Sequence, residues 1–278
     1  MTPPRAVAIL GLGLMGGSLA RDLAASGIQV QGYDADDRSC RQALAAGVLA
    51  EVLDDELTGL RAADLVVLAT PVDRTGAMLA RLAPRLKDGC LVTDLGSTKR
   101  TILAQASEAG LGGRFVGAHP LAGDHRSGWE AARAGLYREA TVFLCPDERA
   151  SAGTVSAVRS FWESVGGRCT IIDAGAHDTL MAWVSHLPQV ASSAVAAALA
   201  GAGHDPATLG RGGRDVTRLA ASSPEMWSAI CRTNGPAIAD AVGALSRELA
   251  GAEAALRAGD DAALRRFFAA GRDWLDAR

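Results

Sequence analysis

Lysine is nearly absent from this 278-residue chain: Lys87 and Lys99 are its only lysines, so arginine carries nearly all of its positive charge. Because no lysine follows Lys99, a mechanism that needs a lysine in the C-terminal half has no candidate residue. The formal net charge of −3 and the isoelectric point near 6.0 argue against nucleic acid or an acidic membrane surface as the main partner. We therefore expect a small-molecule substrate, with no nucleic-acid and no membrane partner.

Cysteine patterns typical of metal sites and disulfide frameworks are missing as well. The cysteines are scattered, without a C-x-x-C pair or a neighbouring histidine cluster, so we expect no metal site and no disulfide. The sequence shows neither a signal-peptide core nor an apolar run long enough to span a bilayer. These features predict a cytoplasmic protein. The cysteines are Cys40, Cys90, Cys145, Cys169 and Cys231.

What the sequence does contain is an alternation of short apolar runs with helical patterns. A chain of this length favours two domains, and the alternation predicts a Rossmann-type α/β N-terminal domain with a parallel-rich sheet over residues 1–173. Gly27, Gly47 and Gly110 stand where helices should end, because glycine tolerates the left-handed cap. Predicted strands cover Ala6–Leu10, Ile28–Tyr33, Leu65–Ala69, Leu91–Thr93, Phe115–Val116, Thr141–Leu144 and Cys169–Ile172. Predicted helices cover Gly17–Ala25, Arg38–Ala46, Thr75–Leu86, Lys99–Ala109 and Thr154–Val165.

Strand signals stop after Ile172, which predicts an all-α C-terminal domain over residues 174–278. Within it, Ala191–Ala200 is rich in small residues that allow helices to pack closely. This composition favours a homodimer formed through the helical domain. The predicted helices are His177–Ala200, Pro206–Ala220, Pro224–Leu249 and Ala252–Leu275.

A glycine-rich loop joins the first predicted strand to the first predicted helix, with the spacing G-x-G-x-x-G. In that setting the first glycine makes the turn, the second lets the backbone approach a pyrophosphate, and the third lets helix and strand pack closely. The helix N-terminus then favours the phosphate charge. The predicted dinucleotide-binding residues of this loop are Gly11, Gly13, Leu14, Met15 and Gly16.

Asp34 follows the second predicted strand, where a carboxylate accepts hydrogen bonds from the adenine ribose hydroxyls. A carboxylate there repels a 2′-phosphate, so we expect NAD rather than NADP, although the nearby Arg38 leaves NADP open. Thr70 and Pro71 end the strand Leu65–Ala69. Because the carboxyl ends of such strands line the ligand crevice, we expect both residues at the cofactor, although Pro71 also serves simply to end the strand.

Longer phrases go beyond a generic dinucleotide-binding domain. In their order and spacing they resemble the prephenate dehydrogenase family, which includes arogenate and cyclohexadienyl dehydrogenases. The resemblance covers nearly the whole chain, and its specific parts are the phrases G-x-H-P-x-A-G and S-H-L-P. The phrases are Gly11-Leu-Gly-Leu-Met-Gly-Gly-Ser18, Asp94-Leu-Gly-Ser-Thr-Lys99, Gly117-Ala-His-Pro-Leu-Ala-Gly123, Ser185-His-Leu-Pro-Gln189, and Arg214-Asp-Val-Thr-Arg218 followed by Met226-Trp227.

The resemblance implies a homodimer and an oxidative decarboxylation in tyrosine biosynthesis. Prephenate and NAD would give 4-hydroxyphenylpyruvate, carbon dioxide and NADH. A hydride leaves the ring carbon that bears the hydroxyl, and loss of the ring carboxylate makes the ring aromatic. Hydride loss leaves positive charge on that carbon, which a neutral histidine stabilises by accepting a hydrogen bond from the hydroxyl.

His119 matches the catalytic histidine of the family, and we expect it in a loop just past the strand Phe115–Val116. A loop histidine bonded to the backbone is the structural alternative. Ser97 matches the family residue that bonds this imidazole and fixes its tautomer, and it also suits the N-cap of a helix opening at Thr98. Lys99 is expected only to solvate that helix start.

The substrate carries carboxylates, which arginine recognises through two parallel hydrogen bonds. Arg218 matches the family arginine that holds such a carboxylate; Arg214, four residues earlier, is a lesser candidate, and a solvated surface arginine is the alternative for each. Ser185 matches a family substrate contact. Gln189 is a departure, because many prephenate-specific members have histidine there, and it leaves prephenate versus arogenate open. His177-Asp178 is expected as a helix start.

Two rival functions remain at this level. A β-hydroxyacid dehydrogenase shares the glycine-rich start and a helical second domain but depends on a lysine that this chain lacks after Lys99. A non-catalytic NAD-sensing regulator would not need His119, Ser97 and Arg218. Inhibition by tyrosine and the strictness of NAD use are not readable from the sequence.

Overall fold

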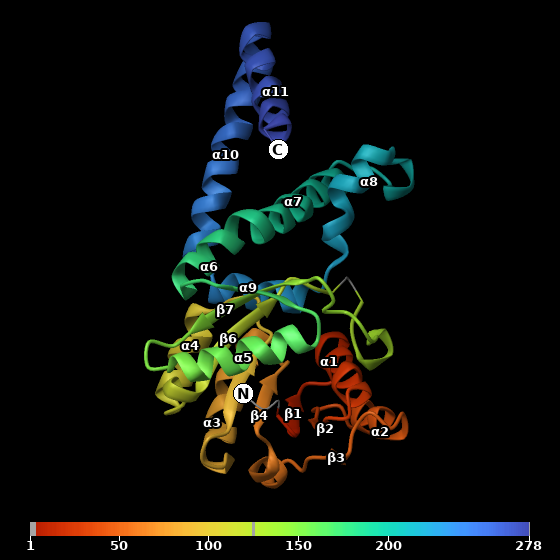
Figure 1. The fold of residues 1–278 in the computed structure, drawn as a ribbon. Helices are drawn as coiled ribbons and strands as arrows, with labels where there is room; N and C mark the ends of the chain where they lie inside the picture. The colour runs from red at the N-terminus through yellow and green to blue at the C-terminus, as the bar shows by residue number, and fades with distance from the viewer. Residues whose placement is uncertain (1–3, 124–125, 278) are drawn as a thin grey trace. The chain divides into compact units, whose positions relative to one another are not determined.

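In the computed structural model, which describes residues 4–123 and 126–277, the strands form one sheet in the order β3-β2-β1-β4-β5-β6-β7-β8 (Figure 1). Two neighbouring central strands, β1 and β4, are uninterrupted apolar runs, as expected for parallel strands buried on both faces. All four residues of β4 are buried, for example. The strands are β1 Ala6–Leu10, β2 Gln29–Tyr33, β3 Glu51–Val52, β4 Leu65–Leu68, β5 Leu91–Asp94, β6 Phe115–Pro120, β7 Thr141–Pro146 and β8 Arg168–Ile171. The fold is the predicted α/β one, with a parallel-rich sheet.

One pairing runs against the others. Strands β3, β2, β1, β4, β5 and β6 are mutually parallel, whereas β6 and β7 pair antiparallel and β8 again runs parallel to β7. The antiparallel ladder lengthens β6 beyond the predicted strand Phe115–Val116, because Gly117 to Pro120 find partners on β7. His119 therefore lies within a strand, opposite Phe143, and the expectation of a loop past the strand is wrong.

Helices cover both faces of the sheet. Val7 and Ile9 of β1 belong to a hydrophobic cluster that also contains Leu23 and Trp162, from the helices α1 and α5. The alternating β1 residue Ala8 is equally inaccessible but lies outside that cluster, on the opposite face. The helices of this part are α1 Leu14–Ala25, α2 Asp37–Ala45, α3 Val72–Leu82, α4 Arg100–Glu108, α5 Ala152–Ser164 and α6 Ala174–Met181. The glycines predicted to end helices, Gly27, Gly47 and Gly110, all have positive φ.

The chain divides into two compact units. One comprises residues 1–181 and 221–234, called here the sheet unit, and the other comprises residues 182–220 and 235–278, called here the helical unit. This division by contacts differs from the boundary at 173/174 expected from the end of the strand signals. The sheet unit includes α6 and also α9 (Pro224–Thr233), whose Arg232 donates to Asp73 of α3 at 2.8 Å.

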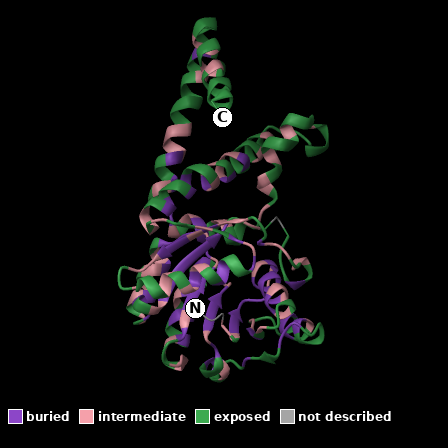
Figure 2. Cartoon of the chain, in the orientation of Figure 1, coloured by how far each residue is buried: buried purple, intermediate pink, exposed green. Residues whose placement is uncertain are grey.

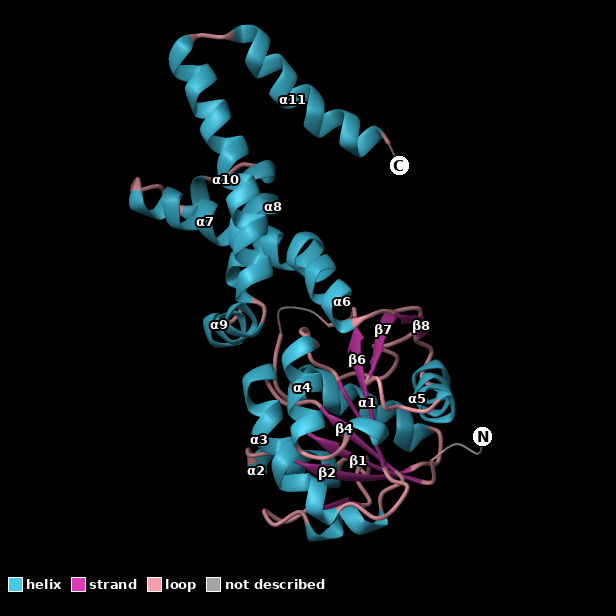
Figure 3. Ribbon diagram, turned by 90° about the vertical axis from the view of Figure 1, so that its left-hand side faces the viewer, coloured by secondary structure: helices cyan, strands magenta, loops and turns pink. Residues whose placement is uncertain are grey.

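The helical unit contains α7 (Leu187–Gly201), α8 (Arg211–Thr217), α10 (Gly235–Ala258) and α11 (Asp261–Asp276). In Figure 3 the described part of this unit consists of helices and their connecting loops. None of the helices in the described residues combines the length and the apolar character needed to cross a bilayer.

The four helices predicted after Ile172 are all broken. The pattern over Pro206–Ala220 becomes α8 between two 3₁₀ turns, and the pattern over Ala252–Leu275 is interrupted between α10 and α11. The pattern over His177–Ala200 becomes α6, a π-helical segment at Ala182–His186, and α7. Pro188 explains the interruption, because its ring displaces the preceding turn and it has no N–H to donate. The pattern over Pro224–Leu249 breaks at Asn234, where α9 ends. Asn234 Nδ2 donates at 2.7 Å to the carbonyl oxygen of Asp178, which holds the end of α9 against α6.

Candidate active site

The loop between β1 and α1 requires glycine at two positions for steric reasons. Gly11 has a φ of 106°, and a Cβ there would lie 2.5 Å from the carbonyl oxygen of Ala69. A Cβ on Gly16 would lie 1.9 Å from the carbonyl oxygen of Gly11. These contacts are shorter than van der Waals contact allows, so Gly11 makes the turn and Gly16 lets helix and strand pack closely.

Gly13 differs, because its missing side chain leaves open space. For a Cβ built on Gly13, the nearest atom among the described residues is the Gly128 nitrogen, at 4.0 Å. Gly13 is the N-cap of α1 and gives no side-chain hydrogen bond to the first turn. Leu14 is buried, and the Met15 carbonyl oxygen accepts a hydrogen bond from the Tyr137 hydroxyl at 2.7 Å. The amides and the positive dipole end of α1 therefore suit a pyrophosphate.

Asp34 lies directly after β2 and ties that strand end to the glycine loop. One carboxylate oxygen accepts from the Leu12 amide at 2.6 Å, and the other accepts from the Asp36 amide at 2.9 Å. Arg38, which left NADP open, forms an exposed ion pair with Glu130 at 2.6 Å. The Asp34 carboxylate therefore lies between the end of β2 and the glycine loop, and the nearby Arg38 guanidinium is paired with the carboxylate of Glu130.

Thr70 and Pro71 lie at the carboxyl end of β4. The two hydroxyls of Thr70 and Thr75 lie 3.2 Å apart, and Pro71 is the exposed N-cap of α3. They share this sheet edge with the glycine loop, because β1 and β4 are parallel neighbours with Leu10 opposite Leu68.

His119 lies near the end of β6 with a side chain that is 9% exposed. Its Nδ1 lies 2.9 Å from Nε2 of His177, in the first turns of α6. His177 in turn places its Nδ1 2.8 Å from the Asp178 carboxylate, and both of these residues are buried. The sequence interpretation of His177-Asp178 as a helix start missed this contact, and the only signal available was a His-Asp pair directly after the last strand.

Ser97 is half-buried in the loop between β5 and α4. The helix that Ser97 was expected to cap begins at Arg100 rather than at Thr98, and its N-cap Lys99 gives no side-chain cap. The helix is capped instead by the carboxylate of Asp178, a residue of α6. This carboxylate accepts hydrogen bonds from the amides of Lys99 at 2.7 Å and Arg100 at 3.0 Å. Among the residues that the structure describes, no hydrogen bond joins Ser97 to His119, and the imidazole contact is made by His177 instead.

Lys99 corrects another expectation. Its side chain is fully buried and pairs with Asp94 at the end of β5, so it does not solvate the helix start. The ammonium also donates to the Ala118 carbonyl oxygen at 2.8 Å, and Asp94 accepts from the Ala118 amide at 2.9 Å. This buried pair therefore clamps β5 to β6 directly beside His119.

Ser185 and Gln189 belong to the helical unit. Ser185 lies in the π-helical segment and is half-buried. Gln189, on α7, is buried and donates at 2.8 Å to the carbonyl oxygen of Leu219. Because Leu219 directly follows Arg218, Gln189 fixes the backbone of the segment that carries this arginine.

Arg214 and Arg218 lie at the end of α8 and in the following 3₁₀ turn, and both are exposed. Arg214 Nε donates to the Leu209 carbonyl oxygen at 2.8 Å, which closes its own loop. The predicted residues thus fall into two groups. The sheet unit holds the cofactor candidates, Ser97 and His119, whereas the helical unit holds Ser185, Gln189, Arg214 and Arg218.

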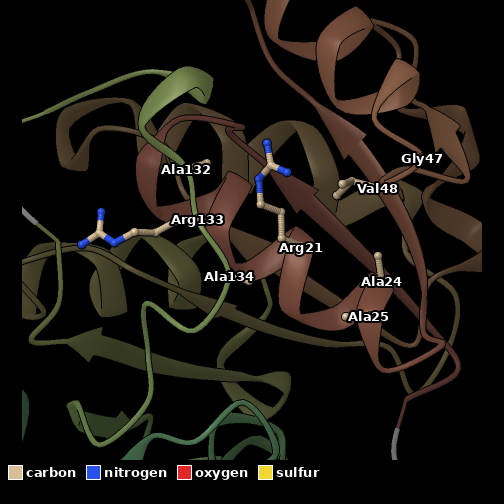
Figure 4. Close-up of a pocket in the computed structure, with 8 residues that line it drawn as sticks. All are labelled: Arg21, Ala24, Ala25, Gly47, Val48, Ala132, Arg133 and Ala134. Carbon is tan, nitrogen blue, oxygen red and sulfur yellow. The ribbon is translucent and has the colours of Figure 1, made fainter.

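A cavity of about 420 Å³ lies elsewhere in the sheet unit, at the C-terminal half of α1 (Figure 4). Arg21 and Arg133 are among its lining residues, and Arg21 places its guanidinium 4.3 Å from the centre of the Trp129 ring. Figure 4 shows the two arginine side chains extending in different directions. Among its described lining residues are none of the predicted site residues, so this cavity is separate from the candidate site. The described residues also contain no cluster of three or more metal-binding side chains.

Family models match almost the whole chain. The nucleotide-binding domain of prephenate dehydrogenase matches residues 19–171, and the dimerization domain of prephenate dehydrogenase matches residues 173–270. A cyclohexadienyl dehydrogenase of Zymomonas mobilis is 34% identical over 86% of this chain and 84% of the relative. A prephenate dehydrogenase of Bacillus subtilis is 32% identical over 97% of this chain and 75% of the relative.

A solved structure gives the same picture of the fold. The prephenate dehydrogenase of A. aeolicus, in complex with hydroxyphenyl propionate and NAD+, superposes with a TM-score of 0.89 at 29% identity. The superposition covers 99% of this chain and 98% of that chain. The similarity therefore extends through both units and is not confined to a dinucleotide-binding half.

Proposed function

Because the chain belongs to the prephenate dehydrogenase family, we propose that it catalyses the NAD-dependent oxidative decarboxylation of prephenate to 4-hydroxyphenylpyruvate in tyrosine biosynthesis. The observation that carries the proposal is His119, whose Nδ1 is held 2.9 Å from a buried partner at the same sheet edge as the glycine loop. A histidine restrained in this way suits a base that works at neutral pH.

His119 accepts the hydrogen of the substrate hydroxyl in the proposed reaction. NAD, when bound, would supply the acceptor for the hydride of the ring C–H bond, and the substrate oxygen develops carbonyl character as that hydride leaves. The bond to the ring carboxylate then breaks, and its electron pair completes the aromatic ring as carbon dioxide departs. The phenolic oxygen takes back the proton from His119, so the reaction needs no external acid or base.

NAD is the proposed cofactor, with NADP disfavoured. The pyrophosphate would lie over Gly13 and the first amides of α1, where a side chain would otherwise occupy the space. Asp34 would accept hydrogen bonds from the adenine ribose hydroxyls, as its position after β2 suggests. The ion pair of Arg38 with Glu130 supports this preference, because a 2′-phosphate would have to compete with a carboxylate for that guanidinium. Thr70 and Pro71 are proposed to border the same site.

We also propose that residues of the helical unit bind the substrate carboxylates. Arg218 is the first candidate, because Gln189 fixes the backbone beside it and arginine binds a carboxylate through two parallel hydrogen bonds. Ser185 is a proposed hydrogen-bonding contact. Arg214 stays a lesser candidate, since its Nε already donates to its own loop.

A homodimer through the helical unit is also part of the proposal. The matched dimerization domain supports it, and so does α11, in which no residue is buried although it carries large apolar side chains. Leu256 is 66% exposed and Phe268 is 70% exposed. Large apolar side chains with this much exposure support an interaction surface on these helices.

The test compares purified protein on prephenate and on L-arogenate, each with NAD and with NADP, by following NADH or NADPH absorbance. Turnover of prephenate with NAD is the expected result. Faster turnover of arogenate would identify arogenate as the substrate. Arogenate is the relevant competitor because Gln189 is neutral where many prephenate-specific members of the family have histidine. Inactivity on all four combinations of substrate and cofactor would refute the proposal. It would instead favour a non-catalytic NAD-binding protein.

A further inference from the structure

A buried line of side chains runs from the end of β6 into α6. His119 Nδ1 lies 2.9 Å from His177 Nε2, and His177 Nδ1 lies 2.8 Å from a carboxylate oxygen of Asp178. His177 and Asp178 have no exposed surface, and the Phe143 ring packs edge-on against His177 with ring centres 5.6 Å apart. The orientation of the middle ring is therefore fixed from several sides.

The acceptor at the end of the line sets the direction of every hydrogen bond in it. Burial by itself would raise the pKa of Asp178, but hydrogen bonds from His177 and from the amides of Arg100 and Lys99 hold that pKa below its ordinary value of 3.8. The carboxylate is thus ionised and only accepts. With a neutral His177, Nδ1 donates to Asp178 and Nε2 carries the lone pair, so His119 donates from Nδ1.

We propose that His177 and Asp178 are positioning residues that hold His119 in the tautomer with its lone pair on Nε2. The inference rests on the proposed role of His119 as the base. When Nε2 takes the proton of the substrate hydroxyl, Nδ1 keeps its own proton and its bond to His177. The positive charge of the imidazolium is then stabilised through His177 by the Asp178 carboxylate, and it disappears when the proton returns to the product oxygen.

The neighbouring charges are compatible with this arrangement. Lys99 and Asp94, on α4 and β5, neutralise each other in a buried pair. Asp173, ahead of α6, is exposed and accepts the Ala176 amide at 2.9 Å. On β7, burial raises the pKa of Cys145 to about 12, so its thiol stays neutral. Among the residues that the structure describes, Asp178 is the carboxylate that hydrogen-bonds His177.

Substitution of His177 separates a positioning role from a packing role. His177→Leu removes the acceptor for His119 Nδ1. We expect kcat on prephenate to fall about 10²-fold, which is the lower end of the range for loss of general-base catalysis. His177→Gln offers a carbonyl oxygen to the same N–H and should recover about tenfold of that loss, the size expected for one hydrogen bond. His204→Leu, at an exposed histidine of the helical unit, is the matched control and should keep wild-type kcat.

The pH profile gives a readout that packing alone would not change. In His177→Leu the acidic limb of kcat/KM should move to lower pH by about one unit, because the imidazolium loses a hydrogen bond linked to a carboxylate. Asp178→Asn should show a similar shift, whereas Asp173→Asn, one turn earlier, should show none. Equal losses in the leucine and glutamine variants with an unmoved acidic limb would overturn the inference.

The wild-type protein alone provides a test that does not depend on the folding of a variant. With ¹⁵N-labelled histidine, the five imidazoles can be assigned by NMR through single substitutions. His119 should show a protonated Nδ1 and an unprotonated Nε2 near neutral pH, and the opposite tautomer would overturn the inference. Failure of the proposed function looks different: either wild type does not turn over prephenate, or His119→Asn remains active while the tautomers are as stated.

Discussion

The sheet unit and the helical unit differ most in how they treat apolar surface. Strands β1 and β4 are almost wholly buried, whereas α11 contains no buried residue (Figure 2). Burial of apolar surface is worth roughly 25 cal/mol per Å², and within one chain this stabilisation is concentrated in the strands of the sheet unit. The helical unit leaves large side chains in water, which is the condition expected of a subunit interface.

The two units also differ in their charges. In the sheet unit the pairs Lys99–Asp94 and His177–Asp178 are fully buried and fix backbone atoms beside His119. In the helical unit, pairs such as Arg257–Glu253 and Arg265–Asp261 are exposed i,i+4 contacts, which contribute little to stability. The sheet unit, where we propose the chemistry to occur, therefore holds the buried charged pairs with fixed geometry. The charged pairs of the helical unit, where we propose substrate recognition and dimerization, are solvated.

If chemistry belongs to the sheet unit, His119→Asn should produce the largest effect. We expect kcat on prephenate to fall about 10³-fold, within the range for loss of a general base. NAD affinity, measured by calorimetry, should be unchanged because the glycine loop is intact. Near-normal turnover in this variant would remove the catalytic assignment.

Lys99→Met tests whether buried polar pairs support the sheet unit. Removing the ammonium leaves the Asp94 carboxylate buried without its cation, so the free energy of unfolding should fall by about 3–5 kcal/mol. Lys87→Met is the matched control, because the Lys87–Asp64 pair is more than a third exposed on each side and is worth about 1 kcal/mol or less. Denaturant unfolding curves compare the two variants, and equal losses would contradict the assignment.

Arg218→Ala tests whether the helical unit recognises the substrate. Loss of a charge-assisted hydrogen bond should lower kcat/KM on prephenate about 10- to 100-fold, with NAD affinity unchanged. Arg211→Ala, which removes an exposed arginine at the start of α8, the helix that precedes Arg218, serves as the control. If kcat/KM is no lower in Arg218→Ala than in Arg211→Ala, Arg218 does not bind the substrate carboxylate.

Phe268→Glu tests whether the exposed apolar face of the helical unit forms a dimer. Placing a charge at a side chain that is 70% exposed in one chain should weaken association roughly tenfold or more if that side chain is buried between subunits. Ala270→Glu adds the same charge at another exposed position of α11. Sedimentation velocity over a concentration series distinguishes the variants, and a monomeric wild type would rule the dimer out.

Among the effects on stability, that of Asp178 should be the smallest, and it should appear as a change in how stability depends on pH in acid. Its folded-state pKa lies below 3.8 because hydrogen bonds from His177 and two amides outweigh the effect of burial. Its contribution to stability is therefore present above about pH 4 and is lost as pH falls through the lower folded-state pKa. Asp178→Asn should flatten this part of the stability–pH curve, and a variant curve parallel to that of wild type would contradict the assignment.

Local patterns predicted the scaffold because they report on short-range physics. An apolar strand, three spaced glycines and a helix were sufficient to predict the loop, and the structure gives the steric reason at Gly11 and Gly16. His119 was found through its motif, although its strand was predicted too short. A short apolar pattern does not reveal an antiparallel partner that is distant in sequence, and β7 supplies that partner.

Residues whose roles depend on distant contacts were misread. The sequence predicts a solvated Lys99, because lysine is usually exposed and nothing adjacent in the sequence indicates the Ala118 carbonyl oxygen to which it donates. The sequence predicts only a helix start at His177-Asp178 and not the contacts of this pair, since those with β6 and α4 span more than fifty residues. The break at Asn234 was missed because its side chain bonds the backbone of α6.

By itself the sequence determined the class of this protein: an α/β sheet with a dinucleotide loop, a helical C-terminal part, and motifs specific enough to indicate the family. Tertiary structure decided which polar groups are buried together. Periodicity and motifs reflect neighbours a few residues apart, whereas the clamp of Lys99 and the line from His119 to Asp178 arise only when separate strands and helices pack and exclude water.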